Sequence, residues 1–383
     1  MPPFRFLHTS DLHLGKRFGR FDEETRMALQ QARQDILPRL AALARDNQAA
    51  HVLLAGDTFD TETPSDRVQR QALAAMGAAE DLTWWIIPGN HDSATAEPLW
   101  AALSKHASRN VKLVMAPEPA EMAPGVFLLP GPCSHRFAGR DLTAWMDSCN
   151  TPPGAIRIGL AHGGVVDFGS EGDGAGETIS PARAGLARLD YLALGDWHGS
   201  LQVNERTNYS GTPEADRFKH AGRGKSLLVE IAAAGQPPRV EALESGQYHW
   251  QELALDLTPA TDIAVEIEGI LPADRASWRY HLLRLRVSGW ATPPQRLTLE
   301  QSIARLAPEF CHLELVADRL GTEHHIEDLD LIGQGGALRV AAEELMQAAK
   351  DPALAQEDRS VASAALNRLF AYMQADAGTE ERR

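Results

Sequence analysis

The stretch His51-Val52-Leu53-Leu54-Ala55-Gly56-Asp57-Thr58-Phe59-Asp60 decides the fold that we expect for this chain. Its first half is a short apolar run of the kind that forms a buried strand, and a glycine closes it. Two aspartates, Asp57 and Asp60, follow at once. In open α/β sheets, ligands bind outside the carboxyl ends of the strands. The stretch therefore predicts a buried strand that carries carboxylates into a binding crevice.

The same arrangement, an apolar run followed by Asp, Asn or His, recurs at four other places. The further predicted strands are Phe4–His8, Trp84–Ile87, Ile156–Ala161 and Tyr191–Leu194. The motifs that follow them are Asp11-Leu12-His13, Gly89-Asn90-His91-Asp92, His162-Gly163-Gly164 and Gly195-Asp196-Trp197-His198-Gly199. Each motif alone is typical of an ordinary turn, but chance is a poor explanation for five at strand ends. Together they predict a crevice of oxygen and imidazole donors, which suits two divalent cations such as manganese or iron.

Helical patterns separate these strands and predict an α/β fold. Apolar residues recur at helical spacing from Met27 to Leu43, with Pro38 as a kink, and again from Asp66 to about Ala79. Strands that alternate with helices indicate βαβ units with both faces of the sheet covered. The runs 226–231 and 238–243 are expected to pair as strands that close this domain, which we place at residues 1–255.

A smaller unit is expected at residues 256–335. Alternating apolar positions predict strands around Ile263–Ile267, Leu283–Val287 and Cys311–Leu315. Thr298 followed by Gln301 resembles a capping box and predicts a short helix between the last two strands. The pattern therefore predicts a ββαβ unit.

A helical tail is expected at residues 336–383. Two helical stretches, Leu338–Ala349 and Val361–Met373, are separated by Asp351-Pro352. The second carries an apolar stripe, formed by Leu366, Leu369, Phe370 and Met373. Such a stripe either packs within the chain's own core or docks on a partner.

Composition limits the class of protein. The chain has 383 residues, 44% of them apolar, and its 52 acidic and 37 basic side chains give a formal net charge of −15. We expect a soluble, cytoplasmic, globular protein of two or three structural units, because no export signal, membrane span or disulfide framework is visible. A protein that held nucleic acid by charge alone would be basic. Any attraction for phosphate must therefore come from bound cations, a local basic patch or a partner subunit.

Basic residues follow the first motif and also occur in a later basic segment, and both sets are candidates for phosphate contacts. These residues are Lys16, Arg17 and Arg20 after the first motif, and Arg217 and Lys219 in the basic segment Asp216–Lys225. We expect them to contact the backbone phosphates of a substrate near the mouth of the site. A solvated turn is an equally good interpretation of the second segment.

The five motifs, in this order, resemble those of the calcineurin-like metallophosphoesterases. They span residues 11–199, about half of the chain. The variants Asp11-Leu12-His13-Leu14-Gly15 and Gly56-Asp57-Thr58-Phe59-Asp60 are similar to those of SbcD-type DNA repair exonucleases. The resemblance implies a four-layer α/β metallophosphoesterase sandwich with a small α/β capping domain and a helical C-terminal tail.

The resemblance also implies a role for each motif residue. One metal ion would be held by Asp11, His13, Asp57 and His198, and the other by Asn90, His162 and Asp196, with Asp57 bridging. His91 would protonate the leaving oxygen, a natural task for a histidine near neutral pH. Asp60 and Asp92 would orient a histidine or close a turn behind the ligands. The family usually has His at the position of Asp196, and we expect the carboxylate to replace that imidazole as a ligand.

The implied activity is that of a metal-dependent phosphodiesterase that cleaves DNA by attack of a metal-bound hydroxide on phosphorus. The metals would be two divalent ions, most of all Mn²⁺, with Fe²⁺ or Mg²⁺ as alternatives. The implied partners are DNA, an SbcC-like coiled-coil ATPase on which the tail helices would dock, and a second copy of the chain. Two other functions stay open. The acidic charge favours an esterase for cyclic nucleotides or other small phosphoesters, and Asp196 favours a weakly catalytic scaffold that binds DNA ends.

Overall fold

The computed structural model describes residues 3–134, 141–165, 178–322 and 336–380, with side chains as far as residue 369. Two compact units, Met1–Trp250 and Gln251–Arg383, make up the chain. Each is described by itself below, and the division at residues 255 and 335 stays a prediction. Within the described residues, no helix is both long and apolar enough to cross a membrane.

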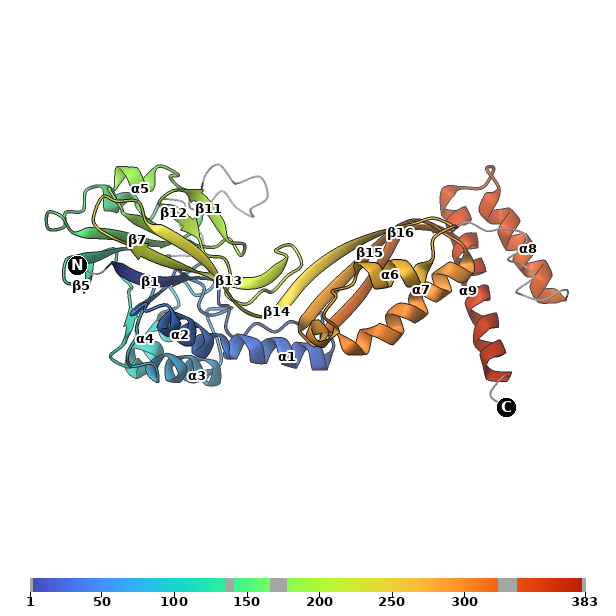
Figure 1. Cartoon of the computed structure of the whole chain (residues 1–383), viewed down its shortest axis with the longest axis horizontal. Coiled ribbons are helices and arrows are strands. Elements are labelled where there is room, and N and C mark those ends of the chain that lie inside the picture. The colour runs from blue at the N-terminus through green and yellow to red at the C-terminus, as the bar shows by residue number, and fades with distance from the viewer. Residues whose placement is uncertain (1–2, 135–140, 166–177, 323–335, 381–383) are drawn as a thin grey trace. The chain divides into compact units, whose positions relative to one another are not determined.

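The first unit contains a sheet in the order β14-β13-β1-β2-β3-β4 (Figure 1). Its strands are β1 (Phe4–Thr9), β2 (His51–Leu54), β3 (Thr83–Ile86), β4 (Val111–Leu113), β13 (Gly222–Ile231) and β14 (Arg239–Leu257). Strands β1 to β4 are parallel, whereas β13 is antiparallel to both of its neighbours. The connecting helices are α1 (Glu23–Gln34), α2 (Ile36–Asp46), α3 (Asp66–Gly77) and α4 (Glu97–His106). The predicted βαβ organisation and the closing strand pair are confirmed.

A second sheet, in the order β11-β12-β10-β7-β6-β5, lies against the first. Its strands are β5 (Ala120–Ala123), β6 (Val126–Gly131), β7 (Ile156–His162), β10 (Tyr191–Gly195), β11 (Leu201–Asn204) and β12 (Thr207–Tyr209). A short pair, β8 (Gly164–Val165) with β9 (Thr178–Ile179), and two single-turn helices, η1 (Ala144–Asp147) and α5 (Arg183–Leu186), complete this part. Strands β6, β7, β10 and β12 run parallel.

Three apolar cores hold these elements in four layers. Helices α2, α3 and α4 pack on one face of the first sheet, around Leu7 and Trp84. The facing sides of the two sheets interdigitate around Phe6, Ile158 and Tyr191. Helix α5 and η1 cover the outer face of the second sheet, as Figure 1 shows. The predicted four-layer sandwich is confirmed.

The helical pattern of residues 27–43 forms two helices instead of one kinked helix. Helix α1 ends at Asp35, whose backbone N–H donates to Gln31 O, and α2 begins at Ile36. Pro38 therefore lies in the first turn of α2. A proline is tolerated there because the first backbone N–H groups of a helix have no acceptor within the helix.

The second unit is built on the end of β14 with β15 (His281–Ala291) and β16 (His312–Thr322). Strands β15 and β16 are parallel. The remaining elements are α6 (Ile263–Ile270), η3 (Arg275–Tyr280), α7 (Pro293–Leu306), η4 (Ala307–Glu309), α8 (Ala337–Lys350) and α9 (Gln356–Glu380). The small α/β unit and the two tail helices are confirmed, and the order of its elements is corrected below.

The predicted strand around Ile263–Ile267 was wrong, because this segment is helix α6. The Asp262 side chain accepts hydrogen bonds from the backbone N–H groups of Ala264 and Val265 and starts the helix. Ile263 and Ile267, four residues apart, are buried, whereas Val265 is 64% exposed. Apolar residues at alternate positions fit a strand, but positions 263 and 267 fit one face of a helix equally well.

The capping box of α7 was placed six residues too late. Thr292 and Gln295 form it, each side chain meeting the other's backbone N–H. Thr298 lies inside the helix and donates its hydroxyl to Pro294 O. Two prolines directly after Thr292 start the helix earlier, because proline is pre-organised for the first turn.

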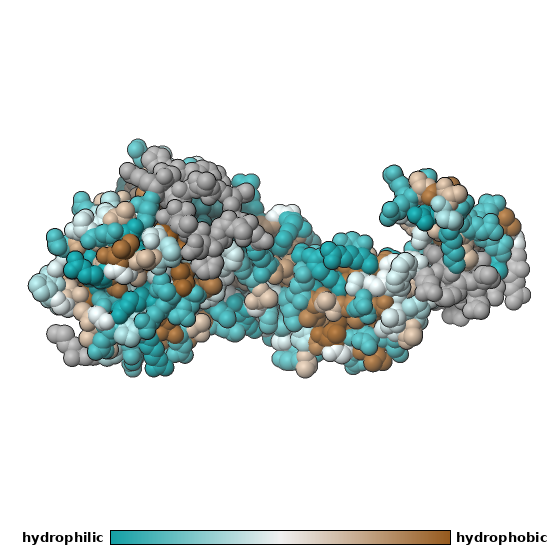
Figure 2. All heavy atoms as spheres, turned by 90° about the horizontal axis from the view of Figure 1, so that it is seen from above, coloured by the Kyte–Doolittle hydropathy of each residue, from teal (hydrophilic) through white to brown (hydrophobic). Residues whose placement is uncertain are grey.

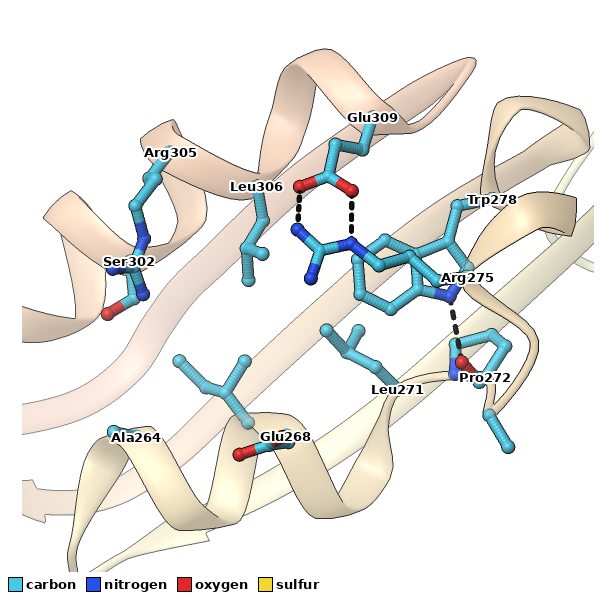
Figure 3. A pocket seen from close by; sticks show the side chains of 12 residues that line it. Ala264, Glu268, Leu271, Pro272, Arg275, Trp278, Ser302, Arg305, Leu306 and Glu309 are labelled. Carbon is cyan, nitrogen blue, oxygen red and sulfur yellow. Dashed lines mark hydrogen bonds and ion pairs between the residues drawn. The ribbon is translucent and has the colours of Figure 1, made fainter.

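A pocket of about 640 Å³ lies among α6, η3 and α7 in the second unit (Figure 3). Its floor is apolar, with Leu271, Leu306 and Trp278, and an ion pair between Arg275 and Glu309 crosses its rim. Figure 2 shows apolar surface gathered on the visible face of this unit. None of the three groups of metal-ligating side chains found among the described residues lies here.

The tail helices form a hairpin with a small core of their own. Ala342, Met346 and Leu366 are buried between α8 and α9. Leu369 packs against them, so this part of the predicted stripe faces the partner helix. The side chains of Phe370 and Met373 lie outside the described residues.

Candidate metal centre

The loops after β1 and β10 bring together the first group of ligands. Asp11, His13 and His198 place one ligand atom each within 4.8 Å of one another. The Nε2 atoms of His13 and His198 are 3.2 Å apart. Two imidazole nitrogens and a carboxylate in this arrangement are suitable ligands for one divalent transition-metal ion.

A second group shares Asp11 with the first and adds residues that follow β2 and end β7. Asp11, Asp57 and His162 again place ligand atoms within 4.8 Å of one another. Asp57 lies between the two groups, because its Oδ2 is 3.7 Å from His13 Nε2 and its Oδ1 is 3.6 Å from His162 Nε2. Each of its two oxygens thus faces a different histidine.

Asn90 and Asp196 lie beside the second group. The Asn90 amide donates to Asp196 Oδ1 at 3.4 Å, and the same oxygen is 3.9 Å from His162 Nε2. Asn90 Oδ1 and His162 Nε2 are buried and have no hydrogen-bond partner among the described residues. Buried polar atoms of this kind require an explanation, and both are metal ligands by chemistry. The side chains therefore fit a divalent cation.

The outward nitrogen of each histidine ligand lies near an oxygen, and those of His162 and His198 form hydrogen bonds. His162 Nδ1 donates to Ala55 O at 2.8 Å, and His198 Nδ1 lies 3.2 Å from Asp216 Oδ1. His13 Nδ1 lies 3.3 Å from Asp60 Oδ1. Contacts of this type leave Nε2 free to accept a metal and orient the ring toward it.

His91 lies at the edge of the centre. Its Nδ1 donates to Asp60 O at 3.0 Å, because a carbonyl oxygen can only accept. Its backbone N–H donates to Asp57 Oδ1 at 2.9 Å, and its ring stands edge-on to His13 with centroids 4.8 Å apart. With Nδ1 engaged, Nε2 is the nitrogen that can exchange a proton. His91 also forms a third close group with His13 and Asp60.

Asp92 is fully buried and ties two motifs together. Its carboxylate accepts from the backbone N–H groups of Phe59 at 3.0 Å and of Gly89 at 2.7 Å. Gly89 also permits a close approach, because a Cβ there would lie 2.1 Å from Asp57 Oδ1. Asp92 contacts no histidine through these bonds. Of the two expected roles, these contacts fit the closing of a turn.

Buried carboxylates dominate the electrostatics. Burial, with the charges of Asp11 and Asp196, raises the pKa of Asp57 to about 7 against the opposing effect of His162. Burial alone would lower the pKa of His162, but the three surrounding carboxylates raise it to about 9. Burial also raises the pKa of Asp196, with a further contribution from Asp11. A cation would relieve this repulsion.

The backbone is left-handed at several of the ligands. The φ angle is 54° at Asp11, 45° at His13, 53° at Asp57 and 103° at Asp196. Only a few per cent of non-glycine residues have positive φ, and Asp, Asn and His are enriched among them. Strain of this kind clusters at functional sites.

Two of the predicted phosphate contacts lie beside the centre. Lys16 Nζ is 2.8 Å from Asp216 Oδ2, and an Arg217 nitrogen is 3.0 Å from His198 Nδ1. The structure does not bring the others there as free cations. Arg20 lies over the rings of Phe21, Phe218 and Trp250, Lys219 lies over Trp197, and Arg17 is exposed.

Asp216 lies outside the five sequence motifs. Its carboxylate is buried and contacts His198 Nδ1 and Lys16, and Arg33 Nη2 is 3.9 Å away. These partners hold its pKa well below the ordinary value, although burial opposes them. Arg33, also buried, donates to Leu12 O and to Glu214 O. No spacing rule signals Asp216, because it lies in a loop and no predicted strand ends directly before it.

Comparisons with known proteins agree with this geometry. Residues 4–187 match the family model described as calcineurin-like phosphoesterase. The D subunit of the nuclease SbcCD from Bacillus subtilis (strain 168) is 26% identical over 289 residues, which are 66% of this chain and 69% of that protein.

Two solved structures are also similar. The protein TT1561 of Thermus thermophilus has 12% identity and a TM-score of 0.42, and a dimetal phosphatase from Danio rerio has 12% identity and a TM-score of 0.39. Each comparison covers 63% of this chain and 99% of the other. The match to the calcineurin-like phosphoesterase model thus falls on the first unit, the part of the chain that contains the clustered ligands.

Proposed function

We propose that the chain is a two-metal phosphodiesterase that acts on DNA. The observation that carries this proposal is the position of Asp57, whose two oxygens face His13 and His162 from opposite sides. A single carboxylate in this position can bridge two ions. We assign Asp11, His13 and His198 to one ion, and Asn90, His162 and Asp196 to the other.

Once bound, a pair of divalent cations generates a nucleophile near neutral pH and neutralises charge on a phosphoryl group. The chain's own residues orient the ligands. Asp60 and Asp216 face the Nδ1 atoms of His13 and His198, and Ala55 O accepts from His162. Lys16 and Arg217 add positive charge beside His198, where phosphate oxygens would arrive.

His91 is the proton donor in this proposal. Its Nδ1–H is held by Asp60 O, so a second proton on Nε2 is available to the leaving oxygen. Proton transfer by a positioned histidine contributes typically 10²- to 10⁴-fold to a rate. Its contact with Asp57 is made through the backbone, which leaves the ring free for this task.

The similarity to a protein named as a nuclease subunit supports DNA as the substrate and an SbcC-like ATPase as the partner. The α8–α9 hairpin is the candidate docking segment, because it exposes Leu338, Val340, Leu354 and Val361 while it buries few apolar side chains. We further propose that Mn²⁺ is the working metal and that two copies of the chain assemble.

One assay tests the proposal. The purified chain is given Mn²⁺, Fe²⁺ or Mg²⁺ and offered linear duplex DNA, single-stranded DNA, bis-p-nitrophenyl phosphate and p-nitrophenyl phosphate. Cleavage of DNA and of the small diester is expected. Activity confined to p-nitrophenyl phosphate or to cyclic nucleotides would identify an esterase for small molecules instead. Binding of DNA ends without hydrolysis would identify a scaffold.

A further inference from the structure

A cavity of about 220 Å³ lies directly beside the metal centre. Three segments line it: 198–200, 210–216 and 220–225, of which the last begins strand β13. His198 and Asp216 belong both to the wall of this cavity and to the surroundings of the centre. A group held in the cavity would therefore lie against His198, which is itself one of the proposed metal ligands.

The cavity carries a surplus of positive charge. Lys225 and Arg223 line it, and Lys225 is exposed with no ion pair among the described residues. Asp216 is the one carboxylate among the lining residues, and His198, Lys16 and Arg217 already contact it. Arg223 Nη1 donates to Gly246 O and Gln247 O, and Arg223 Nε lies 3.8 Å from the exposed carboxylate of Glu244. This local charge contrasts with the net charge of −15 for the chain.

The walls suit a compact polar group. Gly199, Gly211 and Gly224 line the cavity, and a Cβ added to any of them would lie within 3.0 Å of a neighbouring atom. Backbone therefore approaches closely on several sides. The other lining residues are Ser, Thr, Ala and His, with no large apolar side chain. Such a lining does not offer a base or another apolar group the surface it would need.

We propose that this cavity is a second phosphate subsite, which binds a phosphate that neighbours the scissile one in the same substrate. Lys225 and Arg223 would contact its oxygens. This inference rests on the proposed function and deepens it, because it predicts a preference for substrates with at least two phosphates. A polynucleotide has them, whereas a lone diester does not. Contacts to flanking phosphates position a strand without reading its sequence.

The test compares thymidine substrates that differ only in their phosphates. TpT has one phosphate, pTpT adds a terminal one, and TpTpT adds an internal one. The unmodified chain is expected to cleave pTpT or TpTpT with a kcat/KM about tenfold above that for TpT, and the better of the two identifies the kind of phosphate bound. Lys225→Ala should remove most of this advantage and Lys225→Glu all of it. Lys225→Arg should keep it.

Two controls make the result specific. Cleavage of TpT and of bis-p-nitrophenyl phosphate should not change in the Lys225 variants, because neither substrate reaches the second subsite. Lys105→Ala, which removes an exposed lysine at the end of α4, should leave all substrates unaffected. On longer strands, the slope of log(kcat/KM) against log[salt] should become shallower by about one unit in Lys225→Ala.

The outcomes separate the two claims. Equal rates on TpT, pTpT and TpTpT, or an advantage that survives Lys225→Glu, would overturn the second subsite while the phosphodiesterase function stands. A chain that hydrolyses none of these substrates with any of the metals would overturn both. A loss on TpT equal to that on pTpT would also overturn the inference, because it would place Lys225 at the scissile phosphate.

Discussion

The metal centre of the first unit and the α8–α9 hairpin of the second differ in the size of the apolar core that supports them. The centre lies at the edge of two sheets that are packed on both faces, and its carboxylates are held in a buried, mutually repelling cluster. Among its described side chains, the hairpin has four buried apolar residues and leaves several others exposed. The well-packed first unit can therefore tolerate a cluster of buried charges that destabilises the folded state. The hairpin, with its small core, depends instead on what covers its exposed apolar side chains.

The largest effect is expected for Asp57→Ala, which removes a carboxylate whose two oxygens face His13 and His162. Metal content, measured by elemental analysis, should fall far below two ions per chain, and hydrolysis of bis-p-nitrophenyl phosphate should become undetectable. Asp46→Ala, which changes an exposed aspartate at the end of α2, serves as the control and should keep both. A fully active Asp57→Ala variant would refute the two-metal proposal.

A smaller loss, confined to turnover, is expected for His91→Asn. If His91 donates a proton and does not bind metal, kcat should fall by roughly 10²- to 10⁴-fold while both ions stay bound. Asp60 would lose one hydrogen-bond donor, so circular dichroism and thermal unfolding should be checked beside the kinetics. Loss of one metal equivalent would instead place His91 among the ligands, as its close grouping with His13 and Asp60 allows.

The metal-free chain should lose stability as the pH rises. Folding raises the pKa of Asp57 from 3.8 to about 7, so the folded chain retains a proton that the unfolded chain releases, and stability falls across this range. Folding also raises the pKa of His162 from 6.5 to about 9, and its stabilising charge is lost as the pH passes through those values. Both effects have the same sign. Burial lowers the pKa of His8, His51 and His220, which increases stability as the pH rises toward 6.5, so the test is made above that range. The Tm should drop between pH 7 and pH 9.

Excess Mn²⁺ should reverse this loss and raise the Tm at pH 8 by roughly 5–10 °C. Asp196→Asn, with one negative charge fewer beside Asp57, should show a weaker dependence on pH in the absence of metal. A Tm of the metal-free chain that stays constant or rises from pH 7 to pH 9 would contradict the electrostatic description of the centre.

The smallest effect on catalysis is expected when the chain is shortened after Gly336. If the hairpin is a docking segment, cleavage of bis-p-nitrophenyl phosphate should stay within about twofold of the full chain, because the first unit has its own cores. Association with a coiled-coil ATPase, followed by co-purification, should be lost. Aggregation or unfolding of the shortened chain would show that the hairpin stabilises the second unit instead.

The first unit was more predictable than the second for a physical reason. Strands β1, β2, β3, β7 and β10 each end in a motif with a chemical requirement, so residues such as Asp57 and His162 could be recognised one strand at a time. The segment 263–267 has no such marker, and its apolar spacing fits a strand and a helix alike until the capping bond of Asp262 decides. The capping box of α7 and the break at Asp35 depend on similar local bonds.

Asp216 could not be predicted from the sequence for a different reason. Its importance comes from burial beside His198, Lys16 and Arg33, which lie far apart in the sequence and meet only when both sheets are formed. Strands β4, β5, β6, β11 and β12 were also missed, because they carry no metal-ligand motif at their ends.

The left-handed backbone at Asp11, His13, Asp57 and Asp196 also limits how this protein can vary. Alanine or a β-branched residue at such a position costs about 1 kcal/mol or more before any metal is considered, whereas Asn and Gly adopt the conformation at little cost. A library selected only for folding, without metal, should therefore still be enriched in Asp, Asn and Gly at these four positions. If these residues do not vary, the cause would be the backbone conformation as well as the chemistry of the reaction.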